Sequence, residues 1–337
     1  MTQTNRRWLL AERPTGLVES KNFQWVEEPV PTPADGQIVA RVLYLSCDPT
    51  QRGWMSRDTY MPAIKIGEVI RSGGLARVVA TKSSDYQVGD LVSGLVGWQD
   101  YVALQGGGMF APSKVPGNVQ PELAMSTLGL TGLTAYFGFL DVGRPQPGET
   151  VVVSGAAGAT GSVVAQIAKI KGCRAIGVAG GKEKCEWLIG EAKLDAVVDY
   201  KSDDVAKKLR ELCPKGIDIF FDNVGGEQLD IALAQLALHG RIVLCGGISQ
   251  YNETSSPPGP KNYLNLIVKR GRMEGFLVSD FASRYGEAVK ALAGWTQEGK
   301  IASRVDIVKG LENAPAALRR LFTGENRGKQ LVHVADA

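Results

Sequence analysis

Two patterns of hydrophobic and polar positions divide the chain. Up to about residue 125, short runs rich in β-branched side chains are separated by Gly, Pro and Asp. Short strands at regular spacing with turn signals between them predict a barrel-like or sandwich β-domain. The strands expected in this part are Gln37–Leu45, Gly67–Ile70, Ala76–Ala80 and Asp90–Val96.

From about Pro121 the chain alternates apolar runs with segments of helical spacing. Strands that are apolar throughout and alternate with helices predict a parallel sheet covered on both faces. The expected strands are Thr150–Ser154, Ala175–Ala179, Ala196–Asp199, Ile217–Phe221, Arg241–Cys245 and Met273–Val278, and the expected helices are Glu122–Leu140, Ser162–Lys171, Lys184–Glu191, Val205–Leu212, Gln228–Ala237 and Ala282–Gly299.

The tail contains a predicted helix over Asn313–Phe322 and a predicted strand over Lys329–Val334, which we expect to rejoin the first domain. The chain therefore divides into a β-rich domain of residues 1–125 and 300–337 and a doubly wound α/β (Rossmann) domain of residues 126–299.

Composition agrees with two ordinary globular domains. The 337 residues are 44% apolar and 22% charged, and the net charge of +3 is scattered rather than clustered, which argues against a nucleic-acid surface. No stretch approaches the roughly 20 apolar residues that span a bilayer. The apolar run after Arg6-Arg7 is too short for an export signal, and five cysteines without a CxxC pair suit a reducing compartment. We expect a cytoplasmic protein.

A glycine-rich turn is the first sign of chemistry. Gly155-Ala156-Ala157-Gly158-Ala159-Thr160-Gly161 lies between a predicted strand and a predicted helix. Glycine permits a tight turn and close approach of the backbone to a pyrophosphate, whose charge is stabilised at the helix N-terminus. A turn that only connects strand to helix is the alternative, but the β-α-β-α-β order that follows favours a dinucleotide.

The end of the next strand indicates which dinucleotide. An NAD site usually has Asp or Glu about 20 residues on, where it accepts a hydrogen bond from the ribose 2′-OH. Here the strand ends in Ala179-Gly180-Gly181-Lys182-Glu183-Lys184, with no acid at the strand end itself and two lysines after it. Cations suit a 2′-phosphate, so we expect NADPH. Glu183 serving a 2′-OH, and Lys182 as a solvated charge at the helix start, remain alternatives.

The histidine count argues against a zinc enzyme. Long-chain alcohol dehydrogenases with a comparable two-domain plan hold a catalytic zinc with Cys and His. This chain has only His239 and His333, both late, and Cys47 is the single cysteine of the first domain before residue 126. We expect no metal site. Without a Lewis acid to polarise an alcohol, reduction of an already activated carbon is favoured.

Several rare blocks in a fixed order make the chain resemble the zinc-free medium-chain dehydrogenases/reductases of the leukotriene B4 dehydrogenase/prostaglandin reductase type, which include plant double-bond reductases and bacterial curcumin reductase. The resemblance spans nearly the whole chain. Besides the glycine turn, the blocks are Tyr44–Pro49 with Arg52-Gly53, Gly129–Tyr136, Phe221–Gly226, Cys245–Asn252, Pro257–Pro260, Arg272–Phe276, Gly310–Pro315 and Gly324–Lys329. The resemblance implies a GroES-like catalytic domain beside the Rossmann domain.

The resemblance also implies a set of cofactor residues. The backbone of Gly158, Ala159, Thr160 and Gly161 would hold the pyrophosphate. Lys184 and Tyr200 would contact the 2′-phosphate, Asn223 would contact the ribose or nicotinamide region, and Asn326 in the tail would hydrogen-bond near the nicotinamide. Two segments would line the groove: Cys245, Gly246, Gly247, Ile248, Ser249 and Tyr251, and Phe276, Leu277 and Val278. We interpret Cys245 as a small buried residue that supplies backbone contacts rather than thiol chemistry.

The sequence departs from the family pattern at two places. Family members commonly have an aromatic residue where this chain has Thr50, and often Met-Pro where it has Leu130-Thr131. By the resemblance both places lie at the substrate or nicotinamide edge, so the preferred substrate is expected to differ.

The expected reaction is hydride transfer from NADPH to the β-carbon of an α,β-unsaturated ketone or aldehyde. Tyr251 is the candidate catalytic residue, because it opens the Pro-rich loop at the carboxyl end of the fifth strand, where ligands bind in open α/β sheets. A phenol is protonated at neutral pH and can donate to the enolate oxygen. Packing on the nicotinamide or ordering of the loop is the alternative role of Tyr251.

Three other functions stay open: a quinone reductase with the same cofactor, an alcohol-oxidising enzyme, which the missing zinc ligands disfavour, and a non-catalytic NADPH-binding sensor. A homodimer is expected by analogy with the relatives, with Met273–Val278 as the strand nearest the interface.

Overall fold

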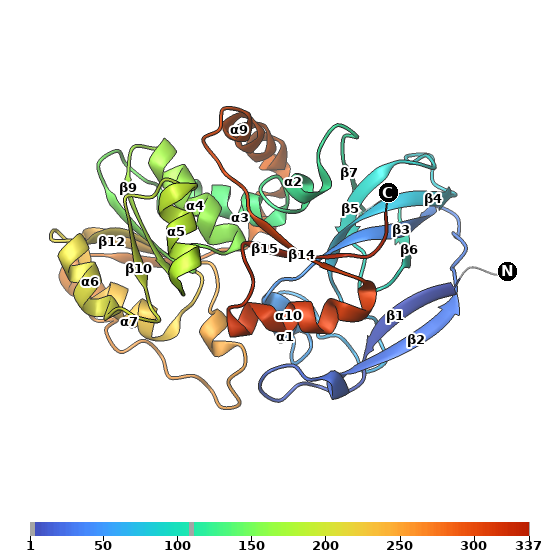
Figure 1. Ribbon diagram of the computed structural model, residues 1–337, viewed down its shortest axis with the longest axis horizontal. Coiled ribbons are helices and arrows are strands. Elements are labelled where there is room, and N and C mark those ends of the chain that lie inside the picture. Colours follow the sequence, from blue (N-terminus) through green and yellow to red (C-terminus); the bar gives the residue numbers. More distant parts are fainter. Residues whose placement is uncertain (1–3, 108–110, 337) are drawn as a thin grey trace. The chain divides into compact units, whose positions relative to one another are not determined.

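A computed structural model describes residues 4–107 and 111–336 (Figure 1), and the chain divides into two compact units. Unit 1 comprises residues 1–125 and 305–337, and unit 2 comprises residues 126–304. None of the helices in the described ranges is long and apolar enough to cross a membrane.

Unit 1 is built on a mostly antiparallel sheet of order β14-β15-β3-β4-β5-β7, with β6 also paired to β3 and a separate hairpin of β1 and β2. The strands are β1 (Thr4–Leu10), β2 (Phe23–Pro29), β3 (Gln37–Ser46), β4 (Gly73–Thr81), β5 (Leu91–Leu95), β6 (Tyr101–Gln105), β7 (Ser113–Lys114), β14 (Val305–Lys309) and β15 (Lys329–His333). The helices are α1 (Thr50–Trp54), α2 (Pro121–Met125) and α10 (Ala314–Thr323). β14 and β15 pair in parallel, so the tail completes this unit.

Unit 2 is a parallel sheet of order β10-β9-β8-β11-β12-β13. The strands are β8 (Thr150–Ser154), β9 (Arg174–Ala179), β10 (Ala196–Asp199), β11 (Ile217–Asp222), β12 (Leu236–Leu244) and β13 (Arg272–Gly275). The helices are α3 (Leu130–Phe137), α4 (Ala159–Ile170), α5 (Lys182–Gly190), α6 (Val205–Leu212), α7 (Gly226–Ala234), α8 (Asn265–Lys269) and α9 (Tyr285–Gln297). This order is the 3-2-1-4-5-6 arrangement of dinucleotide-binding folds, whose direction reverses between β8 and β11.

The two faces of this sheet are covered by different helices, as the alternation of side chains along each strand requires. Val151 and Val153 pack in a core with α3, α4 and α9, whereas Val152 between them packs in a second core with α6 and α7. The expected fold, a doubly wound Rossmann sheet with a separate β-rich domain, is confirmed.

Several expected elements have different bounds in the structure, and two helices differ most. The single helix over Glu122–Leu140 is wrong: α2 and α3 are separate, and a π-helix follows over Gly138–Gly143. Any side chain at Gly132 would collide with the carbonyl oxygen of Thr127, so the chain doubles back tightly between the two helices. The helix over Gln228–Ala237 ends at Ala234, because the next residues already pair with β11 as part of β12.

The strand expected over Gly67–Ile70 is wrong, since Val69 forms only an isolated bridge to Leu9. The strand expected over Met273–Val278 is shorter, because β13 ends at Gly275 and a 3₁₀ helix begins at Val278. The hairpin of β1 and β2 was not predicted, because neither TNRRWLL nor FQWVEEP alternates apolar and polar residues along its length, and residues 11–22 separate the two strands.

Candidate cofactor and active site

The glycine turn forms a tight cradle between β8 and α4. Gly155 has φ +58°, which glycine adopts without strain, and its carbonyl oxygen accepts a hydrogen bond from the Gly158 amide at 2.9 Å. At Gly161 an added Cβ would lie 3.0 Å from the Cα of Ala156 and nearer still to the carbonyl oxygen of Gly155. No side-chain hydrogen bond caps α4 at Gly158. Amides at the start of α4 therefore suit an anion, and a Cβ at Gly161 would push the start of α4 away from the glycine turn.

Ser154, at the end of β8, joins the cradle to the end of β11. Its hydroxyl donates to Oδ1 of Asp222 at 2.8 Å and accepts from the Asn223 amide at 2.8 Å. The side-chain amide of Asn223 donates to the Ser154 carbonyl at 2.7 Å. Asn223 is therefore held rigidly beside the glycine turn at the point where the strand order reverses.

Asp222 is fully buried and organises the loop that follows it. Besides Ser154, the amides of Val224 and Gly225 donate to its Oδ1 at 3.0 and 2.9 Å. Burial raises the pKa of Asp222 above its usual value, against the effect of these hydrogen bonds. Oδ2 has no hydrogen-bond partner among the residues that the structure describes.

The segment Cys245–Tyr251, after β12, lies against the same loop. The amides of Cys245 and Gly246 donate to the Asp222 carbonyl at 2.9 and 3.0 Å, and the Ser249 amide donates to the Val224 carbonyl at 3.1 Å. Burial, with a smaller effect of Asp222, raises the pKa of the Cys245 thiol to about 12. The thiol is therefore protonated at neutral pH, which disfavours thiol chemistry at this position.

Tyr251 follows a 3₁₀ turn over Ile248–Gln250 and folds back on its own loop. Its phenol oxygen accepts a hydrogen bond from the Gly247 amide at 3.1 Å, and an added Cβ at Gly246 would lie 3.3 Å from it. In this bond the phenol oxygen accepts through a lone pair, so the bond itself does not use the phenol proton. The structure thus holds the hydroxyl group of Tyr251 at the carboxyl end of β12.

The residues expected at the 2′-phosphate lie after two neighbouring strands, Lys184 after β9 and Tyr200 after β10. The ring of Tyr200 lies on Gly180, where an added Cβ would come within 2.5 Å of the ring carbon that carries the hydroxyl. The Gly181 and Lys201 amides donate to Oδ1 of Asp199 at 2.8 and 3.0 Å. These bonds fix the turn between β9 and α5, in whose first turn Lys184 lies.

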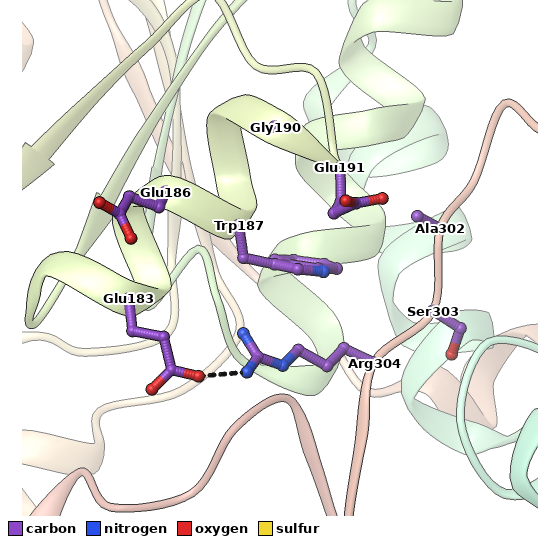
Figure 2. A pocket seen from close by; sticks show the side chains of 8 residues that line it. All are labelled: Glu183, Glu186, Trp187, Gly190, Glu191, Ala302, Ser303 and Arg304. Atoms are coloured by element: carbon purple, nitrogen blue, oxygen red, sulfur yellow. Dashed lines mark hydrogen bonds and ion pairs between the residues drawn. The ribbon is translucent and has the colours of Figure 1, made fainter.

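Asp199 brings a carboxylate close to this turn. Burial alone would raise the pKa of Asp199, but the Gly181 and Lys201 amides, together with the Lys201 charge and the Ser202 hydroxyl, hold the pKa below its usual value. The carboxylate is therefore ionised at neutral pH. Glu183, the acid that the sequence left as an alternative ligand of a 2′-OH, forms an ion pair with Arg304 at 2.5 Å (Figure 2).

Phe276, Leu277 and Val278 follow β13. The Phe276 ring packs in the space that a side chain at Gly138 would fill and meets Phe221 edge to face, with ring centroids 6.5 Å apart. Leu277 is exposed, and the Val278 carbonyl accepts from the Tyr285 hydroxyl at 3.1 Å. The aromatic ring is therefore part of the core, whereas Leu277 offers its side chain to solvent.

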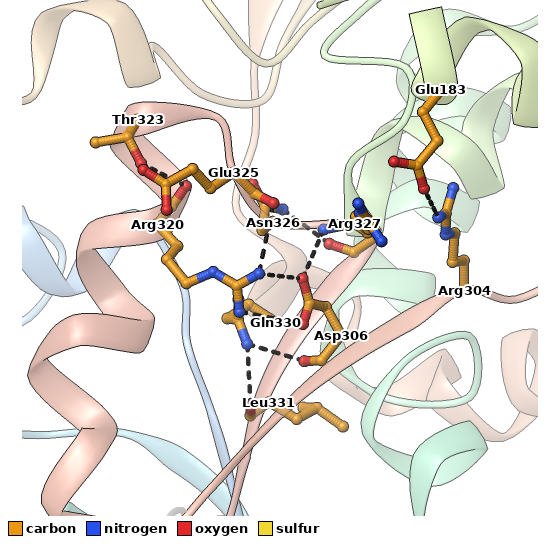
Figure 3. A network of polar contacts seen from close by, with 11 residues as sticks. Glu183, Arg304, Asp306, Arg320, Thr323, Glu325, Asn326, Arg327, Gln330 and Leu331 are labelled. Atoms are coloured by element: carbon orange, nitrogen blue, oxygen red, sulfur yellow. Dashed lines mark hydrogen bonds and ion pairs between the residues drawn. The ribbon is translucent and has the colours of Figure 1, made fainter. Parts of the chain in front are cut away.

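Asn326 belongs to unit 1, where its side-chain amide donates to the Gly328 carbonyl at 2.9 Å within the tail. Figure 3 shows how the tail is held. Arg320 and the Arg327 amide both bond to the Asp306 carboxylate, at 2.8 and 2.9 Å. The bend that presents Asn326 is thus fixed by an ion pair between α10 and β14.

Reasoning from sequence missed three polar residues of these sites. Ser154 and Asp222 each end an apolar strand, and that position was the available signal for both. Lys329 is fully buried in unit 1, where its ammonium lies 2.5 Å from Asp48 and 3.2 Å from the Cys47 carbonyl oxygen. Lys329 is the first residue of β15, and a lysine at the start of a strand gives no such signal in the sequence.

The two histidines lie on different units, His239 in β12 and His333 in β15. Within residues 4–107 and 111–336, no group of three His, Cys, Asp or Glu side chains is placed to hold a metal ion. Burial raises the pKa of the Cys47 thiol to about 12, which makes Cys47 a poor thiolate ligand.

Comparison with known proteins places this architecture in a family. Residues 6–111 match the family described as the N-terminal domain of oxidoreductase, and residues 159–294 match the family described as zinc-binding dehydrogenase. The chain is 43% identical to the NADPH-dependent curcumin reductase of Escherichia coli (strain K12), over 99% of this chain and 98% of that protein. It is 40% identical to the NADP(+)-dependent 2-alkenal reductase of Nicotiana tabacum, over 88% of this chain and 87% of that protein.

The crystal structure of CurA in complex with NADPH from Vibrio vulnificus superimposes with a TM-score of 0.92. The two sequences are 42% identical, and the match covers 98% of this chain and 100% of that chain. The likeness therefore extends through both units.

Proposed function

Because the chain belongs to the NADPH-dependent medium-chain dehydrogenases/reductases, we propose that it reduces the activated C=C bond of α,β-unsaturated ketones and aldehydes with NADPH. The observation that carries the proposal is the glycine cradle at the β8–β11 switch point, in a chain that matches NADPH-dependent reductases along its whole length. The cradle fits the dinucleotide, because Gly161 lets the start of α4 pack directly on the backbone of Gly155 and Ala156, which places the amides at the start of the helix beside the glycine turn.

We assign the pyrophosphate to the backbone of Gly158–Gly161, the 2′-phosphate to Lys184 and Tyr200, and the ribose and nicotinamide to Asn223 and the Cys245–Tyr251 segment. Phe276–Val278 would line the groove, and Asn326 would hydrogen-bond near the nicotinamide. Lysine suits a phosphate as a point charge, and burial raises the pKa of the Tyr200 phenol, which keeps it a hydrogen-bond donor.

When bound, NADPH supplies the hydride that the β-carbon of the substrate accepts. Tyr251 donates its phenol proton in a hydrogen bond to the substrate carbonyl oxygen and stabilises the negative charge that develops there. A proton from solvent then reaches the α-carbon, so that one hydride and one proton are added across the double bond. The Gly247 amide holds the phenol oxygen of Tyr251 in place throughout.

We propose that this reaction needs no zinc, although one matching family is described as zinc-binding dehydrogenase. The residues support this: Cys47 is buried with a pKa near 12, and neither histidine lies near it in the sequence. Turnover should be unchanged after dialysis against a strong chelator, and metal analysis should find less than about one zinc per ten chains. A loss of turnover that added zinc restores would refute this part.

We further propose a homodimer formed through the outer edge of β13, which ends the sheet order of unit 2. Shortly before β13 in the chain lies the α8 patch, Tyr263, Leu264, Ile267 and Val268, each more than half exposed. A sheet edge and an exposed apolar patch each favour a second copy, whose own edge and patch would cover both. Light scattering should give a dimer for the wild type and a monomer for Ile267→Glu; a monomeric wild type would refute the proposal.

We assign the protein to the cytoplasm, because all five cysteines are free in the structure. Fractionation that finds it outside the cytoplasm would overturn this assignment.

Turnover of a panel of enones, enals, quinones and nitroalkenes, each with NADPH and NADH and followed by nucleotide absorbance, tests the function. We expect enone or enal reduction with NADPH to exceed quinone reduction. Faster quinone turnover would make the protein a quinone reductase of the same fold. Saturable NADPH binding without consumption across the panel would instead favour a non-catalytic sensor.

A further inference from the structure

The turn after β11 is locked to the Cys245–Tyr251 segment after β12. The Ile248 amide donates to the Asn223 carbonyl at 3.3 Å. The amide and the hydroxyl of Ser249 both donate to the Val224 carbonyl, at 3.1 and 2.6 Å. Ser249 lies two positions before the candidate catalytic tyrosine. The backbone that leads into this tyrosine therefore depends on the conformation of the turn after β11.

Two consecutive glycines let the two segments pack backbone to backbone. Gly225 has φ +73°, and a Cβ added to it would lie 3.4 Å from the Cα of Gly247. Gly226 has φ +56°, and its added Cβ would lie 3.0 Å from the hydroxyl oxygen of Ser249. Glycine adopts such angles freely, but it has more conformational freedom to lose than any other residue. The turn therefore needs contacts from outside to keep one conformation.

The side chain of Asp222 supplies these contacts. Its Oδ1 accepts hydrogen bonds from the amides of Val224 and Gly225 at 3.0 and 2.9 Å and from the hydroxyl of Ser154 at 2.8 Å. Asp222 is fully buried, so bulk solvent does not compete for these donors. Val224 joins the two sets of bonds, because its amide is held by Asp222 and its carbonyl holds Ser249.

We propose that Asp222 is a positioning residue for the hydride transfer. Its carboxylate fixes the turn that carries Asn223, and through that turn it fixes the backbone before Tyr251. Asp222 acts through these two residues and has no contact with the reacting atoms as its role. This inference rests on the proposed function and deepens it, because it names the buried group that holds the nicotinamide half of the site together.

Steady-state kinetics of the full chain, with NADPH and the fastest substrate of the panel, test the proposal. We expect Asp222→Ala to lower kcat at saturating NADPH by at least about tenfold, because displacing a reacting group by about 1 Å can cost about a hundredfold. Asp222→Asn keeps an acceptor oxygen in the place of Oδ1. Its kcat should therefore stay within about threefold of wild type.

Binding of adenosine 2′,5′-bisphosphate, measured by calorimetric titration, separates positioning from a general loss of structure. This fragment carries the 2′-phosphate but lacks the nicotinamide half, so we expect it to bind at the turn between β9 and α5, away from Asp222. Its affinity should stay within about twofold of wild type in both Asp222 variants.

Asp218→Ala is the matched control. Asp218 lies on the same strand, and its Oδ2 accepts from the Thr150 amide at 2.8 Å, at the start of β11 and β8 rather than at their carboxyl ends. The control thus removes a carboxylate and a hydrogen bond to a backbone amide without touching the turn. Its kcat should stay within about twofold of wild type.

Ser154→Ala is the second variant, because Asp222→Ala leaves two buried amides without their acceptor. It removes only the hydroxyl that joins Asp222 to the Asn223 amide, and kcat should fall at least about threefold. If Asp222→Ala does not fold, an unchanged kcat in Ser154→Ala would overturn the proposal.

Four outcomes with a folded Asp222→Ala would overturn it as well. These are a kcat within about threefold of wild type, an Asp222→Asn variant no more active than Asp222→Ala, an equal loss of fragment binding, and an equal fall of kcat in Asp218→Ala. A wild type that binds no NADPH, or that reduces nothing in the panel, would instead refute the proposed function before any variant is compared.

Discussion

Replacing Gly161 by alanine should damage the cofactor cradle more than any other single methyl group added to the glycine turn. The new Cβ would lie 3.0 Å from the Cα of Ala156, whereas ordinary contacts begin at 3.4 Å, and the Gly155 carbonyl oxygen is nearer still. Both neighbours are backbone atoms and cannot rotate away. The start of α4 must therefore move outward by at least 0.4 Å, the difference between these two distances.

Such a shift has two measurable effects. Overpacking of this kind costs about 1–3 kcal/mol, which should lower the thermal midpoint. The amides at the start of α4 would also be displaced from the pyrophosphate, and a hydrogen bond to a charged group contributes about 1.5–3 kcal/mol. We therefore expect NADPH binding to weaken at least about tenfold, measured by calorimetric titration.

Gly294→Ala is the control for the added methyl group. Gly294 lies inside α9, and nothing lies within 4 Å of its added Cβ, so alanine should be neutral or stabilise by about 0.5–1 kcal/mol. NADPH affinity should not change. If Gly161→Ala kept the wild-type thermal midpoint and bound NADPH within about twofold of wild type, the cradle would not be the pyrophosphate site.

Three further changes address other parts of the two units. Tyr251→Phe should lower kcat for an enone at saturating NADPH by at least about tenfold, and a change under about threefold, worth less than 1 kcal/mol, would refute the donor role. Asp222→Asn tests the pH dependence: burial raises the folded pKa of Asp222 above its unfolded value of 3.8, so its contribution to stability is present below that pH and is lost as pH rises through the folded pKa. Urea unfolding should therefore show the variant gaining stability relative to wild type as pH rises above 3.8, and a constant difference would contradict the shift. Lys329→Met should destabilise the protein by about 3 kcal/mol, because it leaves the Asp48 carboxylate without its 2.5 Å partner, and the double variant with Asp48→Asn should recover part of this loss; additive losses would exclude the coupling.

Much of the fold could be predicted from hydrophobic periodicity. Thr150–Ser154, Ala196–Asp199 and Val205–Leu212 match β8, β10 and α6 residue for residue, because each is bounded by a glycine, aspartate or cysteine turn. The helix over Glu122–Leu140 could not be divided from its pattern alone. The break depends on the close approach of Gly132 to the backbone of Thr127, which is possible only because glycine has no side chain. Hydrophobic periodicity carries no information about such a contact.

The candidate site was predictable to the extent that strand ends mark it. The glycine turn, Asn223 and the Cys245–Tyr251 segment all follow apolar strands, so the predicted strand ends identify all three as candidate site residues. The ion pair of Arg304 with Glu183 could not be predicted from the sequence, because 121 positions separate the two residues. Glu183 was therefore an ambiguous acid in the sequence, and the structure supplies the cation beside it.

The geometry at Tyr251 links two roles that the sequence left as alternatives. A phenol that orders its loop and a phenol that donates to substrate are different hypotheses only if one hydrogen bond excludes the other. Here the oxygen accepts from the Gly247 amide at 3.1 Å, which uses a lone pair and not the proton. An amide that donates to the phenol oxygen also polarises the O–H bond and strengthens it as a donor. Gly247→Pro, which removes this amide, should then lower kcat even with Tyr251 intact, whereas an unchanged kcat at saturating NADPH would separate the two roles.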